Sequence, residues 1–403
     1  MISFYAAQVF AFLSWLLAMA WVWQAVASLR GMPTLPDLTG KEAAALPPLP
    51  ATEAPHITVI VPARNEEKSI EIALRSLLAS TSIRLQIIAV DDRSTDRTGT
   101  LVDELAAEAA AAGGPHELRV LHVRELPAHW LGKTHAMALA AQQATTPWLL
   151  FTDGDVVFHP QALELALREA QARKTDHLIL VPTLILKTTG ERAMLAAMQV
   201  LAQWGVRLWK VSDPRARDFI GVGGFNLVRH EVYTQVGGFD ALPMEVLEDL
   251  RFGWKIKRSG YVQRVVIGPD LVRIRWIEGV LAVAQLVEKN GFAVCRYRLG
   301  PFLLACLGMS VQALLPLAAI AAGGSSLVAG LLTYAAIALV YIANRHVTQV
   351  SPWLAVFFAP AAAVLVYAYV RSVVLALVNN GVTWRGTRYS LDELRSHAGP
   401  GFW

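Results

Sequence analysis

Three long uncharged stretches stand out in the hydrophobic pattern of this chain. Residues 1–29, 302–343 and 353–370 contain no Asp, Glu, Lys or Arg. A helix of about 20 apolar residues crosses the hydrocarbon core of a bilayer. The first stretch therefore predicts one membrane span, the second predicts two that divide at a Gly-Gly-Ser-Ser sequence, and the third is a fourth candidate. A buried core helix is the alternative, chiefly for the third stretch, because Pro360 lies inside it and Arg371 follows it.

The residues that flank these stretches indicate the orientation of the chain. Ala25-Val26-Ala27 resembles a signal-peptide cleavage site, but no positive segment precedes the apolar stretch, so we expect residues 1–30 to remain as an anchor. Basic residues favour the cytoplasmic side. They place the polar middle and the basic tail, residues 379–403, in the cytoplasm, and they are Arg30, Arg296, Arg298, Arg385, Arg388 and Arg395. Four full spans would put both termini outside, so one segment within residues 301–378 is expected to be re-entrant or interfacial.

The polar middle predicts an α/β domain. Residues 31–55 contain six prolines and are predicted to be a linker. From residue 56 to about residue 268, short apolar runs alternate with helical patterns, which is typical of a parallel sheet with crossover helices. Strands are expected at 57–61, 85–90, 120–123 and 148–151, and helices at 66–80, 102–112 and 133–144.

Acidic clusters follow two of these strands. Asp91-Asp92 follows the strand at 85–90, and Asp153-Gly154-Asp155 follows the strand at 148–151. Open α/β sheets bind ligands at the carboxyl ends of their strands, and carboxylate oxygens suit Mg²⁺ or Mn²⁺. The alternative is a pair of solvated turns, since Asp and Gly are common there. A third cluster, residues 245–250, opens a predicted helix and offers either a catalytic base or partners for the helix dipole.

Composition and missing motifs exclude several classes of protein. Hydrophobic residues make up 54% of the 403 residues and charged residues only 17%, which points to membrane content. Neither a P-loop nor a Gly-x-Gly-x-x-Gly sequence opens the domain, which disfavours P-loop NTPases and dinucleotide-binding dehydrogenases. The net charge is +4, but no basic block interleaves with aromatic residues, so no nucleic-acid partner is expected. The two cysteines, Cys295 and Cys306, suggest no disulfide framework.

Five motifs in series give this chain a family resemblance. They are Val61–Glu67, Asp91-Asp92 with Ser94 and Asp96, Gly132-Lys133, Asp153-Gly154-Asp155, and Glu248-Asp249 with Gly260. In order and approximate spacing they resemble family 2 glycosyltransferases with a GT-A fold, over about residues 56–276. The flanking apolar stretches and the tail sequence Trp384-Arg385-Gly386 resemble membrane-bound members that glycosylate lipids, such as ceramide glucosyltransferases and bacterial carotenoid- or hopanoid-associated enzymes.

The resemblance implies a role for each motif. The donor loop, residues Pro62, Ala63, Arg64 and Glu66, would border the base and ribose, and Asp91 and Asp92 would contact uracil. Asp155 would ligate Mg²⁺ or Mn²⁺, with Asp153 on the metal or the ribose. Asp249 would be the general base, with Glu248 as a second catalytic candidate. Lys133 would meet a phosphate or a sugar hydroxyl, although a lysine at a helix start is often only solvated.

One motif of the membrane-bound members is incomplete here. Many of them carry Gln/Arg-x-x-Arg-Trp after the base helix, whereas this chain has Val272 at the first position, Arg273 one residue late, and then Arg275 and Trp276. We expect Arg273 and Arg275 to offset leaving-group charge and Trp276 to pack on the acceptor. The alternative is that both arginines face anionic lipid headgroups. The next segment, residues 277–300, is predicted to hold an amphipathic helix, either interfacial or packed on the domain.

The expected function is an inverting transfer of sugar. The donor would be a UDP-sugar, with UDP-glucose expected, and the acceptor a lipid hydroxyl or carboxyl in the cell membrane. A polyprenyl-phosphate glycosyltransferase and a polysaccharide synthase are the enzymatic alternatives, and a catalytically silent membrane scaffold is the non-enzymatic one. A transporter is disfavoured, because the two clearest apolar stretches lack charged residues.

Overall fold

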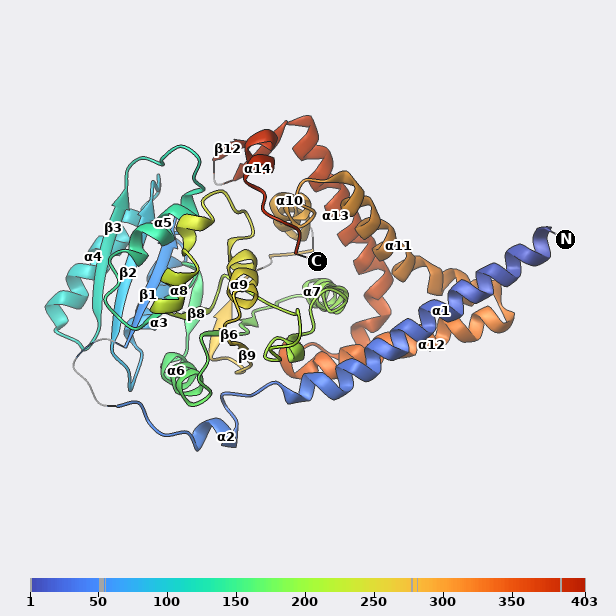
Figure 1. Ribbon diagram of the computed structural model, residues 1–403, viewed down its shortest axis with the longest axis horizontal. Helices are drawn as coiled ribbons and strands as arrows, with labels where there is room; N and C mark the ends of the chain where they lie inside the picture. The colour runs from blue at the N-terminus through green and yellow to red at the C-terminus, as the bar shows by residue number, and fades with distance from the viewer. Residues whose placement is uncertain are drawn as a thin grey trace.

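A seven-stranded sheet forms the centre of the polar domain. The computed structural model describes residues 2–50, 54, 56–276, 278–280, 282–384 and 386–402, and Figure 1 shows their arrangement. The strand order is β3-β2-β1-β4-β8-β6-β9. The strands are β1 (Ile57–Ala63), β2 (Leu85–Asp92), β3 (Glu117–Val123), β4 (Trp148–Phe151), β6 (His177–Leu180), β8 (Asn226–Arg229) and β9 (Gln263–Val266). The expected α/β class with a mostly parallel sheet is confirmed.

The register brings the ends of the central strands together. Strands β2 and β4 both pair in parallel with β1, so that Ile57 lies opposite Leu85 on one side and Trp148 on the other. Only β8 runs antiparallel to its neighbours. Every residue of β1, β2 and β4 is buried, as expected for strands covered on both faces. Asp91-Asp92 and Asp153-Gly154-Asp155 therefore lie at the same edge of the sheet, as the sequence predicted.

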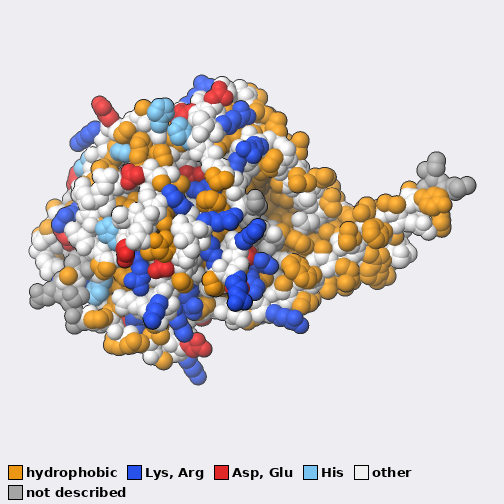
Figure 2. All heavy atoms as spheres, in the orientation of Figure 1, with side chains coloured by type: hydrophobic (Ala, Val, Ile, Leu, Met, Phe, Trp, Pro, Cys, Tyr) orange, Lys and Arg blue, Asp and Glu red, His pale blue; other side chains and the backbone are white. Residues whose placement is uncertain are grey.

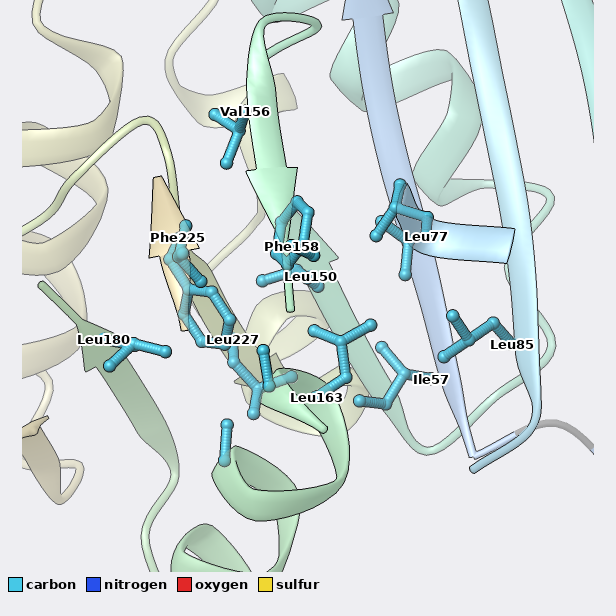
Figure 3. Packing of buried hydrophobic residues seen from close by; sticks show 14 of the residues in the cluster. Ile57, Leu77, Leu85, Leu150, Val156, Phe158, Leu163, Leu180, Phe225 and Leu227 are labelled. Carbon is cyan, nitrogen blue, oxygen red and sulfur yellow. The ribbon is translucent and has the colours of Figure 1, made fainter. Parts of the chain in front are cut away.

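Helices cover both faces of this sheet. They are α3 (Ile70–Leu78), α4 (Thr98–Ala112), α5 (Gly132–Ala141), α6 (Ala162–Ala172), α8 (His230–Gln235) and α9 (Glu248–Arg258). Figure 3 shows one side of the resulting core, where Leu77, Leu150 and Leu163 meet residues of the neighbouring strands. A second, three-stranded sheet has the order β5-β10-β7, formed by β5 (Val156–Phe158), β10 (Val272–Ile274) and β7 (Thr183–Leu184).

Several element boundaries differ from the sequence expectation. The helix expected at 102–112 begins at Thr98, and the helix expected at 133–144 spans Gly132–Ala141. The helix expected from residue 66 begins at Ile70, because residues 65–67 hydrogen-bond to the loop at 94–98 instead. The strand expected at 120–123 begins at Glu117. This strand is at the edge of the sheet, and its exposed Glu117 and Arg119 hide the apolar pattern that marks a buried strand.

Four helices are long and apolar enough to cross a membrane. They are α1 (Ile2–Gly31), α11 (Leu299–Ala322), α12 (Gly324–Thr348) and α13 (Phe358–Val378). Apolar side chains cover the part of the molecule formed by α1, α11 and α12, which projects away from the domain (Figure 2). Helix α13 continues through Arg371 to Val378, and Pro360 causes no break because it lies in the first helical turn.

Helix α13 differs from the other three because both of its ends lie against the polar domain. Its first residue, Phe358, belongs to a buried cluster with helix α7 (Thr189–Ala202) of the domain. Its last residue is followed by a hairpin of β11 (Gly381–Trp384) and β12 (Thr387–Ser390), whose Thr387 accepts a hydrogen bond from Arg64. In Figure 1 this helix runs along the domain, at the base of the projecting helices.

The predicted linker and tail are both packed on the domain. Leu38 donates a backbone hydrogen bond to Ile267, and it joins the core with Ala43 of the short helix α2 (Lys41–Ala44). Helix α14 (Leu391–His397) follows the hairpin and buries Leu391 and Leu394 in a cluster with Phe219. The amphipathic helix expected within residues 277–300 is α10 (Ala282–Val294), which packs along α13. Arg385, named in the tail motif, lies outside the described residues.

Candidate active site

A buried lysine lies at the centre of the acidic residues that end the strands. The Nζ atom of Lys133 lies 2.6 Å from Oδ1 of Asp153 and 2.6 Å from Oε1 of Glu248. Helix α5 supplies the lysine, the turn after β4 supplies Asp153, and the first turn of α9 supplies Glu248. The side chain of Lys133 is only 13% exposed. The alternative of a solvated lysine is therefore wrong, and three of the five sequence motifs meet at one point.

Two glycines allow this close approach. A Cβ atom at Gly132 would lie 2.1 Å from a carboxylate oxygen of Asp92, and one at Gly223 would lie 2.7 Å from Oδ2 of Asp153. Real Cβ atoms essentially never approach other atoms this closely. Gly132 therefore joins the Asp91-Asp92 end of β2 to the lysine, and Gly223 closes the other side of Asp153. Gly132 belongs to the Gly132-Lys133 motif, and the family resemblance assigned Gly223, within Gly221–Phe225, to a loop that would frame the acceptor. Neither glycine was predicted to contact a donor-side carboxylate.

Burial and the neighbouring charges shift the pKa values of Lys133 and Asp155. Burial lowers the pKa of Lys133, but the negative charges of Asp153, Glu248 and Asp249 outweigh that effect and hold it above its usual range. Burial raises the pKa of Asp155 to about 7, and the charges of Asp153 and Glu66 add to the rise. One lysine thus faces several carboxylates, so the site attracts cations.

Asp155 has the features of a carboxylate that lacks its ligand. Its Oδ1 atom is buried and has no hydrogen-bond partner among the described residues. A buried polar atom without a partner costs about 1–3 kcal/mol, and a bound cation is one way to remove that cost at a carboxylate. Within the described ranges no three His, Cys, Asp or Glu side chains converge as a ready cation cage. Mg²⁺ is commonly held by one or two carboxylates together with substrate phosphates, and Asp155 with Asp153 fits that arrangement.

Asp249 is the second residue of α9, the helix that also carries Glu248. Its Oδ1 atom accepts a hydrogen bond of 2.6 Å from the backbone N–H of Leu250. Burial and the neighbouring charge of Glu248 raise its pKa above the ordinary value, although Lys133 opposes the shift. A carboxylate with a raised pKa is a better proton acceptor at neutral pH. Glu248 instead has its Oε1 atom paired with Lys133, so Asp249 is the better candidate for a base.

Two interlocked loops form the side of the site next to β2. The backbone N–H of Asn65 donates to Ser94, and that of Glu66 donates to Thr98. In return, Asn65 accepts from the N–H of Thr95. These bonds fix the loop that follows Pro62 and Ala63, both of which are buried in β1.

The two aspartates at the end of β2 have different partners. Asp92 pairs with the neighbouring Arg93 at 2.8 Å. Asp91 lies 3.1 Å from Nδ1 of His122, whose other ring nitrogen lies 3.0 Å from Asp103. Hydrogen bonding to Asp103 and Asp91 raises the pKa of His122. The structure thus brings the expected donor residues to one edge, and it adds Arg93 and His122 to them.

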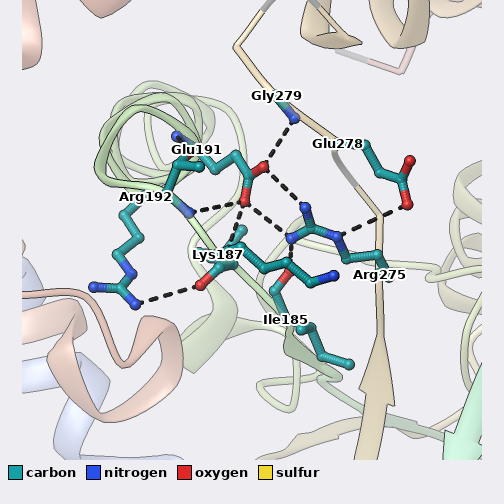
Figure 4. Close-up of polar contacts among 9 residues, drawn as sticks. Ile185, Lys187, Glu191, Arg192, Arg275, Glu278 and Gly279 are labelled. Atoms are coloured by element: carbon teal, nitrogen blue, oxygen red, sulfur yellow. Dashed lines mark hydrogen bonds and ion pairs between the residues drawn. The ribbon is translucent and has the colours of Figure 1, made fainter.

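Arg273 lies on β10, and Arg275 and Trp276 follow directly after it; Figure 4 shows the surroundings of Arg275. Arg275 forms a two-pronged ion pair with Glu191, with both N–O distances at 2.9 Å. Glu191 also accepts from the backbone N–H groups of Lys187 and Gly279. Its side chain and Thr188 complete a capping box at the start of α7. Arg275 is thus committed to a local structural pair, whereas Arg273 and Trp276 are exposed.

A buried polar network supports the loop beside Asp249. Gln263 of β9 accepts from the N–H of Ile220 at 3.0 Å and donates to its carbonyl at 2.7 Å. The same side chain bonds to the ring of His177, which bonds to Asn226. The next residue along the loop, Gly221, packs directly on the backbone carbonyl of Asp249. The sequence does not reveal the network of Gln263, His177 and Asn226, because their three strands are distant along the chain.

The domain matches a known family over most of the residues that build this site, up to the residue before Glu248. Residues 58–247 match the family model described as glycosyl transferase family 2. The polar middle of this chain is a family 2 glycosyltransferase domain. The match covers the interlocked loops, Lys133 and the Asp-Gly-Asp turn.

Curated relatives and a solved structure agree with this assignment. The 4,4'-diaponeurosporenoate glycosyltransferase of Staphylococcus aureus (strain USA300) is 26% identical over 198 residues, which are 49% of this chain and 50% of the relative. The sequence from strain MRSA252 is 24% identical over the same length. The chain thus spans about half the length of these curated relatives. A mannosyltransferase from Pyrobaculum calidifontis, solved with GDP-Man and Mn²⁺, has a TM-score of 0.50 and 19% identity over 90% of this chain and 99% of its own, which supports the GT-A-like fold.

Proposed function

We propose that this chain is a membrane-bound inverting glycosyltransferase that moves a sugar from a UDP-sugar, UDP-glucose in the first instance, to a lipid acceptor. The observation that carries the proposal is the meeting of Lys133, Asp153, Glu248 and Asp249 at the sheet edge, next to Asp155 with its unpartnered oxygen. The lipid acceptor is supported by the apolar helices around the domain and by the relative named for a carotenoid acid.

The donor would lie along the sheet edge. Asp91 and Asp92, with the loop of Arg64 and Glu66, would hold the base and ribose, and Lys133 would contact a diphosphate oxygen. Asp155, assisted by Asp153, would hold Mg²⁺ or Mn²⁺. When bound, such an ion neutralises negative charge on the diphosphate. The unpartnered oxygen of Asp155 supports this part of the proposal.

The transfer itself would use Asp249 as the base. The acceptor oxygen attacks the anomeric carbon, and the bond from that carbon to the diphosphate oxygen breaks. The proton of an acceptor hydroxyl passes to the carboxylate of Asp249, and the nucleoside diphosphate leaves with the bonding electrons. Lys133, already held at the site by Asp153 and Glu248, would offset charge on the departing diphosphate.

The membrane arrangement follows from the positions of the helix ends. We propose that α1, α11 and α12 cross the bilayer and that α13 lies at its cytoplasmic surface, since both ends of α13 contact the domain. A crossing helix would have to place its ends on opposite sides, about 30 Å apart. Three crossings starting outside would leave the domain, the hairpin and α14 all in the cytoplasm. This agrees with the basic residues that flank the spans.

The experiment is a transfer assay on the purified full chain. The protein would be reconstituted with a lipid extract and given radiolabelled UDP-glucose or GDP-mannose, each with Mn²⁺ and with EDTA. The expected result is a labelled lipid that forms from UDP-glucose only when metal is present. A labelled polyprenyl phosphate would support the alternative acceptor, and a product that grows in length would support a polysaccharide synthase. No labelled product with any donor would contradict the proposal.

A further inference from the structure

A basic segment lies where the domain meets the membrane helices. Residues 205–218 connect α7 to the loop before β8, and we call them the basic segment. Val211 of this segment is buried with Met32, next to the end of α1, and with Ala343, in the last turns of α12. The ring of Trp209 lies against Gly31, the last residue of α1, where an added Cβ would be 2.3 Å from it. The basic segment is therefore fixed at the level where two apolar helices end.

The charges of this segment are only partly neutralised within the protein. Asp218 is buried and pairs with Arg207 at 2.8 Å, and Asp213 lies 3.6 Å from Lys210. Arg215 and Arg217 are exposed and form no ion pair with any described residue. Two more exposed arginines, Arg30 and Arg345, stand near the ends of α1 and α12. Figure 2 shows basic side chains gathered where the globular part meets the apolar helices.

Aromatic residues lie on the membrane side of this basic surface. Trp204, just before the basic segment, makes an edge-to-face contact with Trp21 of α1 at 5.2 Å between ring centroids. Trp23 of the same helix is 57% exposed. Tryptophan is enriched at the level of lipid headgroups, and basic residues beyond it attract anionic lipids. The sequence of apolar helix, tryptophan and free arginine matches the profile of a bilayer surface.

We propose that the basic segment, with Arg30 and Arg345, is a binding surface for the headgroups of anionic phospholipids. Continuity with the apolar helices selects a lipid over a soluble anion, because the bilayer surface is already placed there by α1 and α12. The surface is distinct from the active site, and the inference rests on the proposed membrane location of these helices rather than on the transfer reaction.

The basic segment is also attached to the helix that carries Asp249. The Nζ atom of Lys257 on α9 donates to the carbonyls of Val211 at 2.6 Å and Asp213 at 2.8 Å. At its other end the segment leads into Phe219, Ile220 and Gly221, and Gly221 packs on the backbone of Asp249. Lipid bound at the basic segment would therefore restrain helix α9, which carries Asp249, through two separate connections.

The test compares lipid selectivity, which needs no assay of transfer. The full chain would be reconstituted in phosphatidylcholine, and the association of spin-labelled phosphatidylglycerol relative to spin-labelled phosphatidylcholine would be measured by electron paramagnetic resonance. We expect about a five- to tenfold preference for phosphatidylglycerol in the wild type. Arg215→Gln/Arg217→Gln should reduce the preference to below about twofold, and raised salt should reduce it too.

The matched control lies at the opposite edge of the sheet. Arg119→Gln/Arg124→Gln removes two exposed charges on and just after β3, whereas the basic segment packs near β9, the other edge strand. The control should keep the wild-type preference, and circular dichroism should show that both variants are folded. The proposal is overturned if the wild type shows no preference, or if Arg215→Gln/Arg217→Gln retains it in full.

Discussion

Two carboxylates in this protein, Glu191 and Asp155, differ in their hydrogen-bond partners and in the direction in which their pKa values are shifted. Glu191 receives bonds from Arg275 and from three backbone N–H groups, and the ion pair with Arg275, followed by these bonds, lowers its pKa to about 2. Asp155 has one oxygen without any hydrogen-bond partner among the described residues, and burial raises its pKa to about 7. Asp155 belongs to the Asp-Gly-Asp motif and keeps an oxygen that can bind a ligand, whereas Glu191 caps helix α7 and both of its oxygens are engaged.

The difference separates structural charge from functional charge. The Glu191 carboxylate is fully engaged by Arg275 and by backbone N–H groups, and it holds the start of α7 to the residue after β10. Arg275 keeps one buried nitrogen, Nε, without a hydrogen-bond partner among the described residues, 3.9 Å from Glu278. The site around Lys133 has more carboxylates than cations. A metal ion and a nucleotide diphosphate together would complete it. We therefore propose that Asp155 serves metal and donor binding and that Asp249 serves the transfer step. The ion pair of Arg275 and Glu191 has a structural role.

The largest effect should come from Asp249→Asn. This change keeps the size of the side chain and removes the proton acceptor, so transfer to a hydroxyl acceptor should fall about 10²–10⁴-fold while the donor still binds. Initial rates with labelled donor, combined with calorimetric donor binding, would measure both quantities. Unchanged transfer would show that the base lies elsewhere, or that the acceptor is a phosphate that needs none.

The second-largest effect is expected for Asp155→Asn, which should weaken metal-dependent binding of the donor. Loss of a metal ligand should weaken donor affinity in Mn²⁺ at least as much as loss of an outer-shell partner does, by about 100-fold. Affinity in EDTA should change little. Glu248→Gln serves as the comparison, because it keeps the Asp153 and Asp155 carboxylates. Equal affinities for the wild type and Asp155→Asn in Mn²⁺ would contradict the assignment.

The pH dependence of donor binding should show the same group. Metal binds the ionised carboxylate, and Asp155 carries its proton below a pKa of about 7. Donor affinity in Mn²⁺ should therefore be constant above pH 7 and fall about tenfold per pH unit below it. Calorimetry between pH 5.5 and about pH 8.5 covers both regimes. A flat profile across this range would exclude Asp155 as the ligand.

The smallest effect is expected at the satisfied pair. Glu191→Gln removes the buried charge partner of Arg275 and leaves it only the exposed Glu278 at 3.9 Å. The apparent Tm should therefore fall by about 3–8 °C while donor affinity stays within about twofold. Because the pKa of Glu191 is lowered in the folded state, its contribution is present above the ordinary pKa and is lost as pH falls toward 2. The control is Arg273→Gln, an exposed neighbour on the same strand. A loss of donor affinity without a fall in Tm would show that this ion pair belongs to the donor site.

The sequence predicted those parts of the site that follow from strand order. The acids at the ends of β2 and β4 were expected at one edge because parallel strands share their direction, and they are there. The sequence did not predict the burial of Lys133 between Asp153 and Glu248, since that depends on how α9 approaches α5. The role of Gly223 was missed for the same reason: a close approach is a tertiary property.

The prediction of the membrane helices from the sequence was limited in the same way. Length and apolar composition correctly identified four helices that are able to span a bilayer. They did not distinguish α13, which has the composition of a spanning helix but has the domain at both of its ends. Basic residues in the sequence indicated that one C-terminal segment should not cross. The contacts of Phe358 and of the hairpin after Val378 support the proposal that this segment is α13.

The most direct test of the central claim is Mn²⁺ binding followed by electron paramagnetic resonance. Wild-type protein with UDP and Mn²⁺ should show protein-bound metal, Asp155→Asn should lose that signal, and Glu191→Gln should keep it. This pattern would show that the carboxylate of Asp155 holds the metal of the donor, whereas the carboxylate of Glu191 has a structural role. An unchanged signal in Asp155→Asn, or a lost signal in Glu191→Gln, would contradict the account.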